Sequence, residues 1–137
     1  MIDENEIVDT LIDTLKSDTE LIDILGKFTV KGGKKEPMLI KGLILPDKWG
    51  VKESTINIYT VAIDNTSDYG RFYFSVSCRG FDYYTSRNIA SKISTLLNRT
   101  HINDRIFVMA AYNQTIPPKE VGLDNYNTPV ELLVRVR

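Results

Sequence analysis

Two β-type segments separated by a cluster of turn-forming residues constrain the fold of this chain more than any other feature. The first, residues 54–63, is dense in β-branched residues and has apolar side chains on both faces, which predicts a strand near the middle of a sheet. In the second, apolar and polar residues alternate from Phe72 to Cys78. Asp, Asn, Ser and Gly dominate residues 64–70, so we expect an antiparallel hairpin with one buried face and one wetter face.

Helical spacing of apolar residues appears on both sides of this hairpin. Residues 7–15 have the pattern of an amphipathic helix, and a longer helix is expected over about 82–98. Ser17 and Glu20 have the spacing of a capping box, which predicts a second, short helix starting at Ser17. Gly26 follows that helix, where a left-handed residue is expected to end it.

The remaining segments indicate strands and one long loop. A short strand is expected at residues 27–31, and longer strands at 38–45, 106–112 and 130–136. Residues 113–128 contain prolines, a glycine and several asparagines but no usable period, so we expect a loop there. The order α-α-β-β-β-β-α-β-β predicts an α+β fold. We expect a single antiparallel or mixed β-sheet of about six strands, with the N-terminal helices and one long helix packed on one face. A helix that crosses from the fourth strand to the fifth allows one parallel pairing.

Length and charge limit the class of protein. The chain has 137 residues, which fits a single domain spanning residues 1–137. It carries 17 Lys and Arg against 18 Asp and Glu, for a formal net charge of −1. A protein that holds phosphates tightly usually carries a clustered basic excess, so this balance argues against a dedicated nucleic-acid binder.

The residue types that carry enzymatic chemistry are scarce. Cys78 is the one cysteine of the chain and cannot form an internal disulfide; its phase in the alternating strand predicts a core position. His101 is the one histidine, which removes the usual basis for a zinc site or a Cys–His pair, and a role at the end of the long helix is favoured. We therefore expect no catalytic residue, no metal site and no cofactor.

No hydrophobic run approaches the roughly 20 residues that a bilayer span requires. Lys41 interrupts the apolar segment at residues 38–45, and the N-terminal residues are acidic where a signal peptide would be basic and then apolar. We expect a protein that is cytosolic where it is made and has no membrane partner.

Two polar clusters deserve comparison with known binding loops. Asp64 and Asp68 supply oxygen ligands in one segment, but the bidentate Glu of a calcium loop is absent, so a simple turn is favoured over a metal site. Residues 31–35 read Lys-Gly-Gly-Lys-Lys, yet a strand follows where a phosphate loop needs a helix. A solvated turn is favoured there, with a weak role near DNA or an acidic partner as the alternative.

Aromatic residues in the expected loops provide the one functional signal of composition and pattern. Trp49, Tyr69 and Tyr126 fall in such segments, where an aromatic side chain either packs locally or contacts a partner. Local packing is the default interpretation. The long segment at residues 113–128 makes a partner contact more plausible for Tyr126.

Three pieces of the chain together resemble a known family. An amphipathic N-terminal helix carries Ile7, Leu11 and Leu15, a strand at residues 72–78 runs directly into the helix at 84–97, and a strand closes the chain. In this order and at this length, the chain resembles the tail-terminator, or tail-completion, proteins of long-tailed bacteriophages and the related neck proteins. The resemblance covers most of the chain and rests on pattern and order.

The resemblance implies a non-enzymatic structural protein of the virion, made and assembled in the bacterial cytoplasm. Such proteins form a homo-oligomeric ring, commonly a hexamer, on the last ring of the tail tube. The ring stops tube growth and forms the interface to the head connector, while DNA passes through its lumen without sequence-specific binding. A near-neutral subunit suits that task, because the lumen should not hold phosphate tightly.

Members of this family build their contacts from sheet edges and loops, which makes residues 64–70 and 113–128 the best positions for contacts with another subunit, the tube or the connector. The basic turn at 31–35 would then face outward. The candidate contact residues are Trp49, Asp64, Asp68, Tyr69, Pro117, Pro118 and Tyr126.

Two alternatives stay open. One keeps the phage context but makes the protein a head–tail stopper or adaptor between portal and tail. The other is a small-molecule-binding or enzymatic α+β domain with a deep, polar pocket under the long loop.

Overall fold

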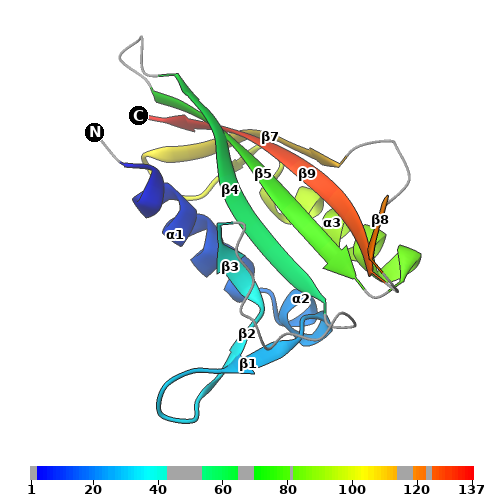
Figure 1. The fold of residues 1–137 in the computed structure, drawn as a ribbon. Helices are drawn as coiled ribbons and strands as arrows, with labels where there is room; N and C mark the ends of the chain where they lie inside the picture. Colours follow the sequence, from blue (N-terminus) through cyan, green and yellow to red (C-terminus); the bar gives the residue numbers. More distant parts are fainter. Residues whose placement is uncertain (1–2, 43–53, 65–69, 81, 114–118, 123–124) are drawn as a thin grey trace.

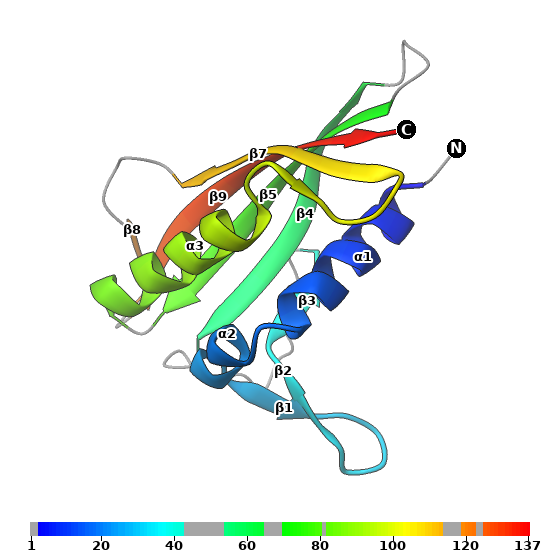
Figure 2. The ribbon, with the colours of Figure 1, turned by 180° about the vertical axis from the view of Figure 1, so that it is seen from behind.

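A computed structural model describes residues 3–42, 54–64, 70–80, 82–113, 119–122 and 125–137 of the chain. Three helices lie on one face of a twisted seven-stranded sheet, so the expected α+β class is confirmed (Figures 1 and 2). The elements are α1 (Glu4–Lys16), α2 (Thr19–Ile24), β1 (Lys27–Thr29), β2 (Lys35–Pro37), β3 (Leu39–Lys41), β4 (Thr55–Asp64), β5 (Gly70–Gly80), α3 (Tyr83–Leu97), β6 (Thr100–His101), β7 (Ile106–Asn113), β8 (Lys119–Gly122) and β9 (Asn125–Val136).

The sheet is mixed, but its parallel pairing is not the one expected. Its strand order is β3-β4-β5-β9-β7-β6, and β8 also pairs with β9. Helix α3 does cross from β5 to β7, and these two strands run in the same direction because both are antiparallel to β9. The C-terminal strand β9 inserts between them, so they do not pair. The parallel pair is β3 with β4 at the other edge.

The hairpin expected from the alternating pattern is confirmed. Strands β4 and β5 pair antiparallel, with Ile58 opposite Val76, and a bulge interrupts the register between Thr60 and Ala62. The expected division of β5 into a buried and a wetter face holds for its first half, where Phe72 and Phe74 are buried and Arg71 and Tyr73 are exposed. Ser75 and Ser77, expected on the wetter face, are buried and hydrogen-bonded to side chains of β9. Strand β4 is second from the sheet edge, with β3 outside it.

The start and end of α2 differ from the expected capping box. Asp18 is the N-cap, and its carboxylate accepts a hydrogen bond from the Leu21 amide at 2.9 Å. The Ser17 hydroxyl instead donates to the carbonyl of Thr14 at 2.6 Å, at the end of α1. Gly26 is not left-handed: Leu25 is already extended, and the Gly26 amide donates to the Ser54 carbonyl at 2.9 Å. A tertiary hydrogen bond therefore replaces the expected helix-ending motif.

The segment expected to be a loop at residues 113–128 contains two strand regions. Strand β8 lies within it, and β9 begins at Asn125 rather than at Val130. Ladder pairing with β5 continues to Gly80 opposite Tyr126, and it overrides the polar composition of this stretch. Pro129 falls between the residues of β9 that pair with β8 and those that pair with β7, so its missing amide costs no ladder bond on that side.

The N-terminal strands also differ from expectation. The segment expected as one strand at 38–45 contains the short β3, and residues 43–53 lie outside the described part of the chain. Strands β1 and β2 form a separate two-stranded ribbon that projects away from the main sheet (Figure 1). Gly32 and Gly33, with φ of 94° and 80°, form its turn, a conformation that favours glycine.

The core lies between the helices and the sheet. Its larger members from α1, α2 and α3 pack on side chains of β4 and β5, and the buried set includes Ile7, Leu11, Leu15, Leu21, Ile89, Ile93, Leu97, Ile56, Ile58, Phe72 and Phe74. Cys78 is fully buried in the same core, as its alternation predicted, and burial raises the pKa of its thiol well above the usual range. Within the described residues, the helices are all too short or too polar to cross a membrane.

Candidate interaction surfaces

The described residues contain no group of three or more His, Cys, Asp or Glu side chains placed to hold a metal ion. The candidate functional features of the described residues are surfaces. Five of the residues proposed from the sequence lie outside the described part of the chain: Trp49, Asp68, Tyr69, Pro117 and Pro118. The structure places the other two, Asp64 and Tyr126.

Asp64 and Tyr126 lie at opposite ends of the sheet. Asp64 ends β4 and is in register with Arg71 of β5, whereas Tyr126, near the start of β9, is in register with Gly80. At about 3.3 Å per residue, the length of β5 between these positions is about 30 Å. The two candidate contact residues therefore belong to two separate surfaces.

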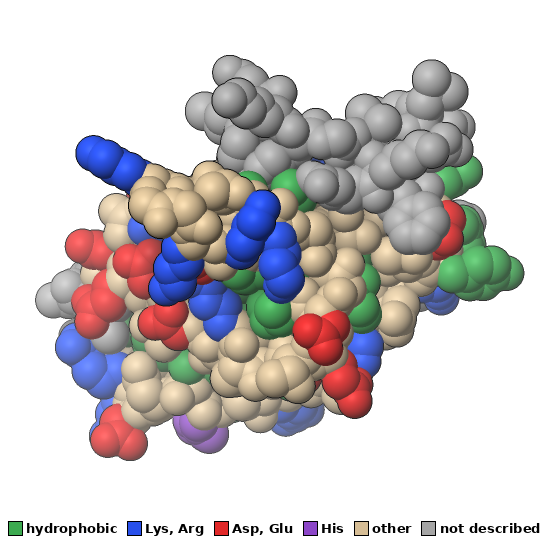
Figure 3. All heavy atoms as spheres, turned by 90° about the horizontal axis from the view of Figure 1, so that it is seen from below, with side chains coloured by type: hydrophobic (Ala, Val, Ile, Leu, Met, Phe, Trp, Pro, Cys, Tyr) green, Lys and Arg blue, Asp and Glu red, His purple; other side chains and the backbone are tan. Residues whose placement is uncertain are grey.

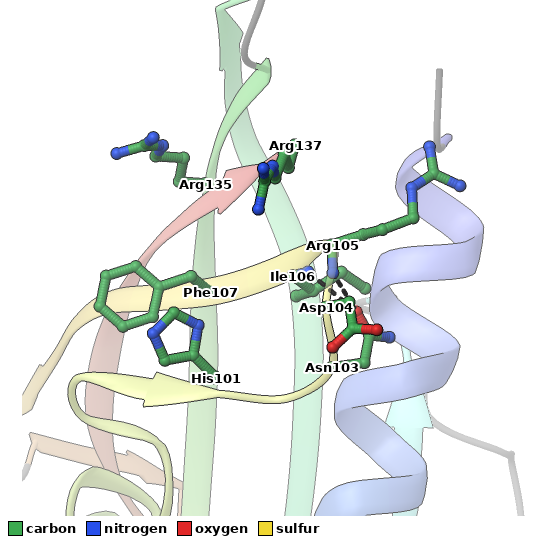
Figure 4. A pocket seen from close by; sticks show the side chains of 8 residues that line it. All are labelled: His101, Asn103, Asp104, Arg105, Ile106, Phe107, Arg135 and Arg137. Atoms are coloured by element: carbon green, nitrogen blue, oxygen red, sulfur yellow. Dashed lines mark hydrogen bonds between the residues drawn. The ribbon is translucent and has the colours of Figure 1, made fainter.

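The end of the sheet near Asp64 is rich in arginine. Arg71 of β5 lies directly opposite Arg135 of β9, and both are exposed. Arg105, Arg135 and Arg137 line a hollow of about 370 Å³ beside the turn between β6 and β7. Figure 4 shows Arg105 and Arg135 extending in different directions, away from one another. This arrangement forms a spread positive surface and does not converge on one small anion.

His101 lies at the same end and is not a helix cap. Helix α3 ends at Leu97, and Arg99, with φ of 55°, turns the chain so that His101 enters β6. Its imidazole stacks on the ring of Phe107, with 4.3 Å between the ring centroids (Figure 4). His101 therefore contributes an exposed aromatic contact to the arginine-rich end.

The other end of the sheet carries a group of tyrosines. The rings of Tyr83 and Tyr126 meet edge to face with centroids 6.5 Å apart, and Tyr83 meets Tyr84 in the same way at 5.1 Å. Tyr84 is 79% exposed, the most exposed of the large hydrophobic side chains. The sequence assigned Tyr126 to a loop; the structure places it on a strand, where it packs beside the start of α3.

The sheet face opposite the helices carries an exposed strip that the sequence analysis did not identify. Val61 is 59% exposed, Tyr112 is 55% exposed and Tyr73 is 36% exposed. With Leu133, these three side chains line a hollow of about 340 Å³. We call these four residues the outer-face strip. Sequence alternation places Tyr73 on the wetter face of β5, and the predicted hairpin places it beside β4, but only the strand order brings residues of β9 and β7 near it. An exposed apolar group of this kind often marks an interaction surface.

The basic turn is exposed, as expected. Lys31, Gly32, Gly33 and Lys34 are all exposed at the tip of the β1–β2 ribbon, and Lys34 contacts Glu36 at 3.5 Å. Strand β2 follows the turn, whereas a phosphate loop would be followed by a helix.

Comparison with known proteins identifies a shared fold. No protein-family model matches the chain, and no curated protein matches its sequence. A chain of a solved structure described as "Virion of native gene transfer agent (GTA) particle" is similar in fold, with a TM-score of 0.61. The match covers 95% of this chain and 93% of that chain, at 12% sequence identity. At this identity, the similarity is one of fold along nearly the whole length of both chains.

Proposed function

We propose that this protein is a structural, non-catalytic subunit of a phage-like virion. The observation that carries the proposal is the fold shared over 95% of this chain with a chain of a gene transfer agent virion. Because the match also covers 93% of that chain, the similarity extends over nearly the whole of both folds and is not limited to one motif.

Within such a particle, the proposed role is that of the tail terminator. A ring of these subunits, commonly a hexamer, would cap the tail tube, stop its growth and meet the head connector, with DNA passing through the lumen. The pieces that resemble this family are present as α1, as β5 running into α3, and as the closing strand β9. The formal net charge of −1 suits a subunit that lies beside DNA without holding it.

The described surfaces also suit a protein with several partners. A closed ring forms when one patch of a subunit fits a different patch of its neighbour. The outer-face strip, the arginine-rich end and the tyrosine group are unlike one another in chemistry, and the last two lie about 30 Å apart along β5. We assign Asp64 and Tyr126 to different contacts on this basis. Trp49, Asp68, Tyr69, Pro117 and Pro118 stay candidate contact residues on the sequence argument alone.

Deletion of the gene from the genome that produces the particle tests this role. A particle without its terminator should form tail tubes of uncontrolled length that do not join heads, as seen by negative-stain electron microscopy. Supplying the wild-type protein should restore tails of uniform length. Tails of normal length joined to heads in the deletion strain would contradict the proposal.

The same particles distinguish the neighbouring role in the neck. A stopper or adaptor would leave tails of uniform length but separate from heads, and it would bind the portal rather than the tube. Pull-down of purified tail tube and purified portal with the tagged protein separates the two roles. The terminator role predicts recovery of the tube.

A further inference from the structure

The β1–β2 ribbon has two chemically different faces. Residues that are in register across an antiparallel pair lie on the same face, so Thr29 shares a face with Lys35 and Phe28 shares the other with Glu36. Lys27, on the same face as Thr29, is exposed, as are Thr29 and Lys35, whereas Phe28 and Glu36 are half-buried. Lys31 is exposed in the turn at the tip of the ribbon. We call Lys27, Lys31 and Lys35 the lysine face.

The lysine face has no acidic partner among the described residues of its own molecule. The ion pairs found there join Lys34 to Glu36, Lys41 to Asp9 and Lys92 to Glu20. Three positive charges therefore project into solvent on a ribbon that extends away from the main sheet (Figure 1).

Helix α1 presents the complementary feature. Glu6, Asp9 and Asp13 are all exposed, and their spacing places them along one side of the helix. We call them the acidic stripe. Asp9 is bound to Lys41 at 2.8 Å, but Glu6 and Asp13 form no ion pair with the described residues. Figure 3 shows both positive and negative side chains on the end of the molecule that it views.

The two features are also of comparable size. Seven residues of helix separate Glu6 from Asp13, a rise of about 10 Å. On the ribbon, Lys35 is in register with Thr29, two residues of strand or about 7 Å from Lys27, and Lys31 lies in the turn beyond them. A ribbon laid along the helix would therefore bring positive charges opposite negative ones.

We propose that the lysine face of one copy of this chain docks on the acidic stripe of α1 in the next copy. The inference rests on the ring proposed above and identifies one of its contacts. The two patches are different surfaces of one subunit, so a bound pair leaves one lysine face and one acidic stripe free. Further copies can therefore add through the same contact until a ring closes. A projecting ribbon suits this geometry because it reaches beyond its own domain.

Charge reversal tests the contact. One variant carries Lys27→Glu, Lys31→Glu and Lys35→Glu; a second carries Glu6→Lys and Asp13→Lys. Each alone places like charges opposite one another, so the oligomer measured by native mass spectrometry should fall at least about tenfold in each. An equimolar mixture of the two variants places opposite charges together again, and assembly should return with the two chains alternating. Assembly of either variant at the wild-type level would overturn the contact.

A matched control separates a specific contact from a general charge effect. Arg87 and Arg99 are exposed and belong to none of the surfaces described above, so replacing both with Glu changes the net charge by four, the same magnitude as in the acidic-stripe variant. This control should assemble as the wild type does. Circular dichroism and thermal melting establish that every variant is folded before assembly is compared.

Cross-linking tests the contact even where the wild-type chain is mainly monomeric. A carbodiimide joins Lys to Asp or Glu only in direct contact, and a mixture of ¹⁴N and ¹⁵N protein marks the cross-links that join two copies. We expect mixed-isotope peptides that link residues 27–35 to residues 4–16, and fewer of them at high salt. Their absence at millimolar protein would overturn the contact.

The outcomes separate this inference from the proposed function. Rings that form normally from either reversed variant overturn the contact and leave the terminator role standing. Cross-links of the expected kind in a protein that does not control tail length overturn the role and leave the contact. A lysine variant that loses binding to a duplex DNA probe while its assembly is unchanged would assign the lysine face to DNA instead, and would overturn the inference.

Discussion

The hydroxyl of Ser86 donates a hydrogen bond to the carbonyl of Cys78 at 2.7 Å, which fixes the start of α3 to the end of β5. The same hydroxyl lies 2.9 Å from the hydroxyl of Thr128, on the neighbouring strand β9. Ser86 and Thr128 are both fully buried. A polar group in a core costs free energy unless it is hydrogen-bonded, so this arrangement stabilises the connection only while it is complete.

Replacement of Ser86 by Ala should therefore destabilise the fold by about 1–3 kcal/mol, because the hydroxyl of Thr128 and the carbonyl of Cys78 lose a buried partner. Urea unfolding followed by circular dichroism gives the free energy of unfolding. Ser91→Ala on the exposed side of α3 is the matched control and should change stability little. Equal losses in the two variants would contradict the role of the buried hydroxyl.

Gly80 allows the close approach of β5 to α3. A Cβ atom at this position would lie 2.5 Å from the backbone nitrogen of Ser86, closer than packed atoms can come. Gly80→Ala should cost about 1–3 kcal/mol, since the first turn of α3 must shift. The melting temperature should fall clearly below that of Asn88→Ala, an exposed control on α3. An unchanged melting temperature would show that the strand–helix connection adjusts freely.

The N-cap of α2 distinguishes the structure from the expected capping box. Asp18→Ala should cost about 1 kcal/mol, because the Leu21 amide loses its side-chain acceptor. Ser17→Ala should cost less, because the Ser17 hydroxyl caps no amide of α2 and donates to the Thr14 carbonyl. Chemical denaturation of the two variants side by side measures the difference. A larger loss in Ser17→Ala would favour the capping box.

The buried thiol of Cys78 makes the free energy of unfolding depend on pH. Burial raises the pKa of the folded thiol, while the unfolded thiol ionises near pH 8.5. The folded state therefore keeps its proton where the unfolded state loses it, and the contribution of the thiol to stability is complete below pH 8.5 and falls as the pH rises. The loss approaches about 1.4 kcal/mol per pH unit above that value.

Unfolding free energies measured between pH 8 and pH 10 test this prediction. Cys78→Ala is less stable overall, because a cavity is left, but its stability should lack the alkaline decrease that the thiol causes in the wild type. Parallel pH profiles for the two proteins would contradict it. Reaction of Cys78 with a thiol reagent should also require unfolding, since the side chain is fully buried.

Local patterns predicted most of the secondary structure and much of the core. The alternation from Phe72 to Cys78 and the helical spacing after it are short-range features, and both elements form where the pattern places them. The start of β9 was not predictable in this way. Asn125 and its polar neighbours form a strand because β5 offers a ladder partner, and that partner is distant in sequence.

The candidate contact residues also divide into those that local sequence indicated and those that only the fold brings together. Sequence pattern identified Tyr126 as an aromatic residue without a core phase, but the neighbouring Tyr83 comes from α3 and only the fold brings the rings together. Val61 and Tyr73 lie on the predicted hairpin, but Tyr112 lies on β7, distant in sequence, and no local signal groups it with them. Their exposed strip exists because β9 inserts between β5 and β7.

The sequence by itself determined the α+β class, the β4–β5 hairpin, the amphipathic helices and the core position of Cys78. Each depends on the periodicity of side chains within individual helices and strands, which can be read from short stretches of the sequence. The tertiary structure decided the strand order, the parallel pair at β3, the N-cap of α2 and the separation of Asp64 from Tyr126. These depend on which distant segments exchange backbone hydrogen bonds, and that choice is made by the free energy of the whole sheet and its packed helices.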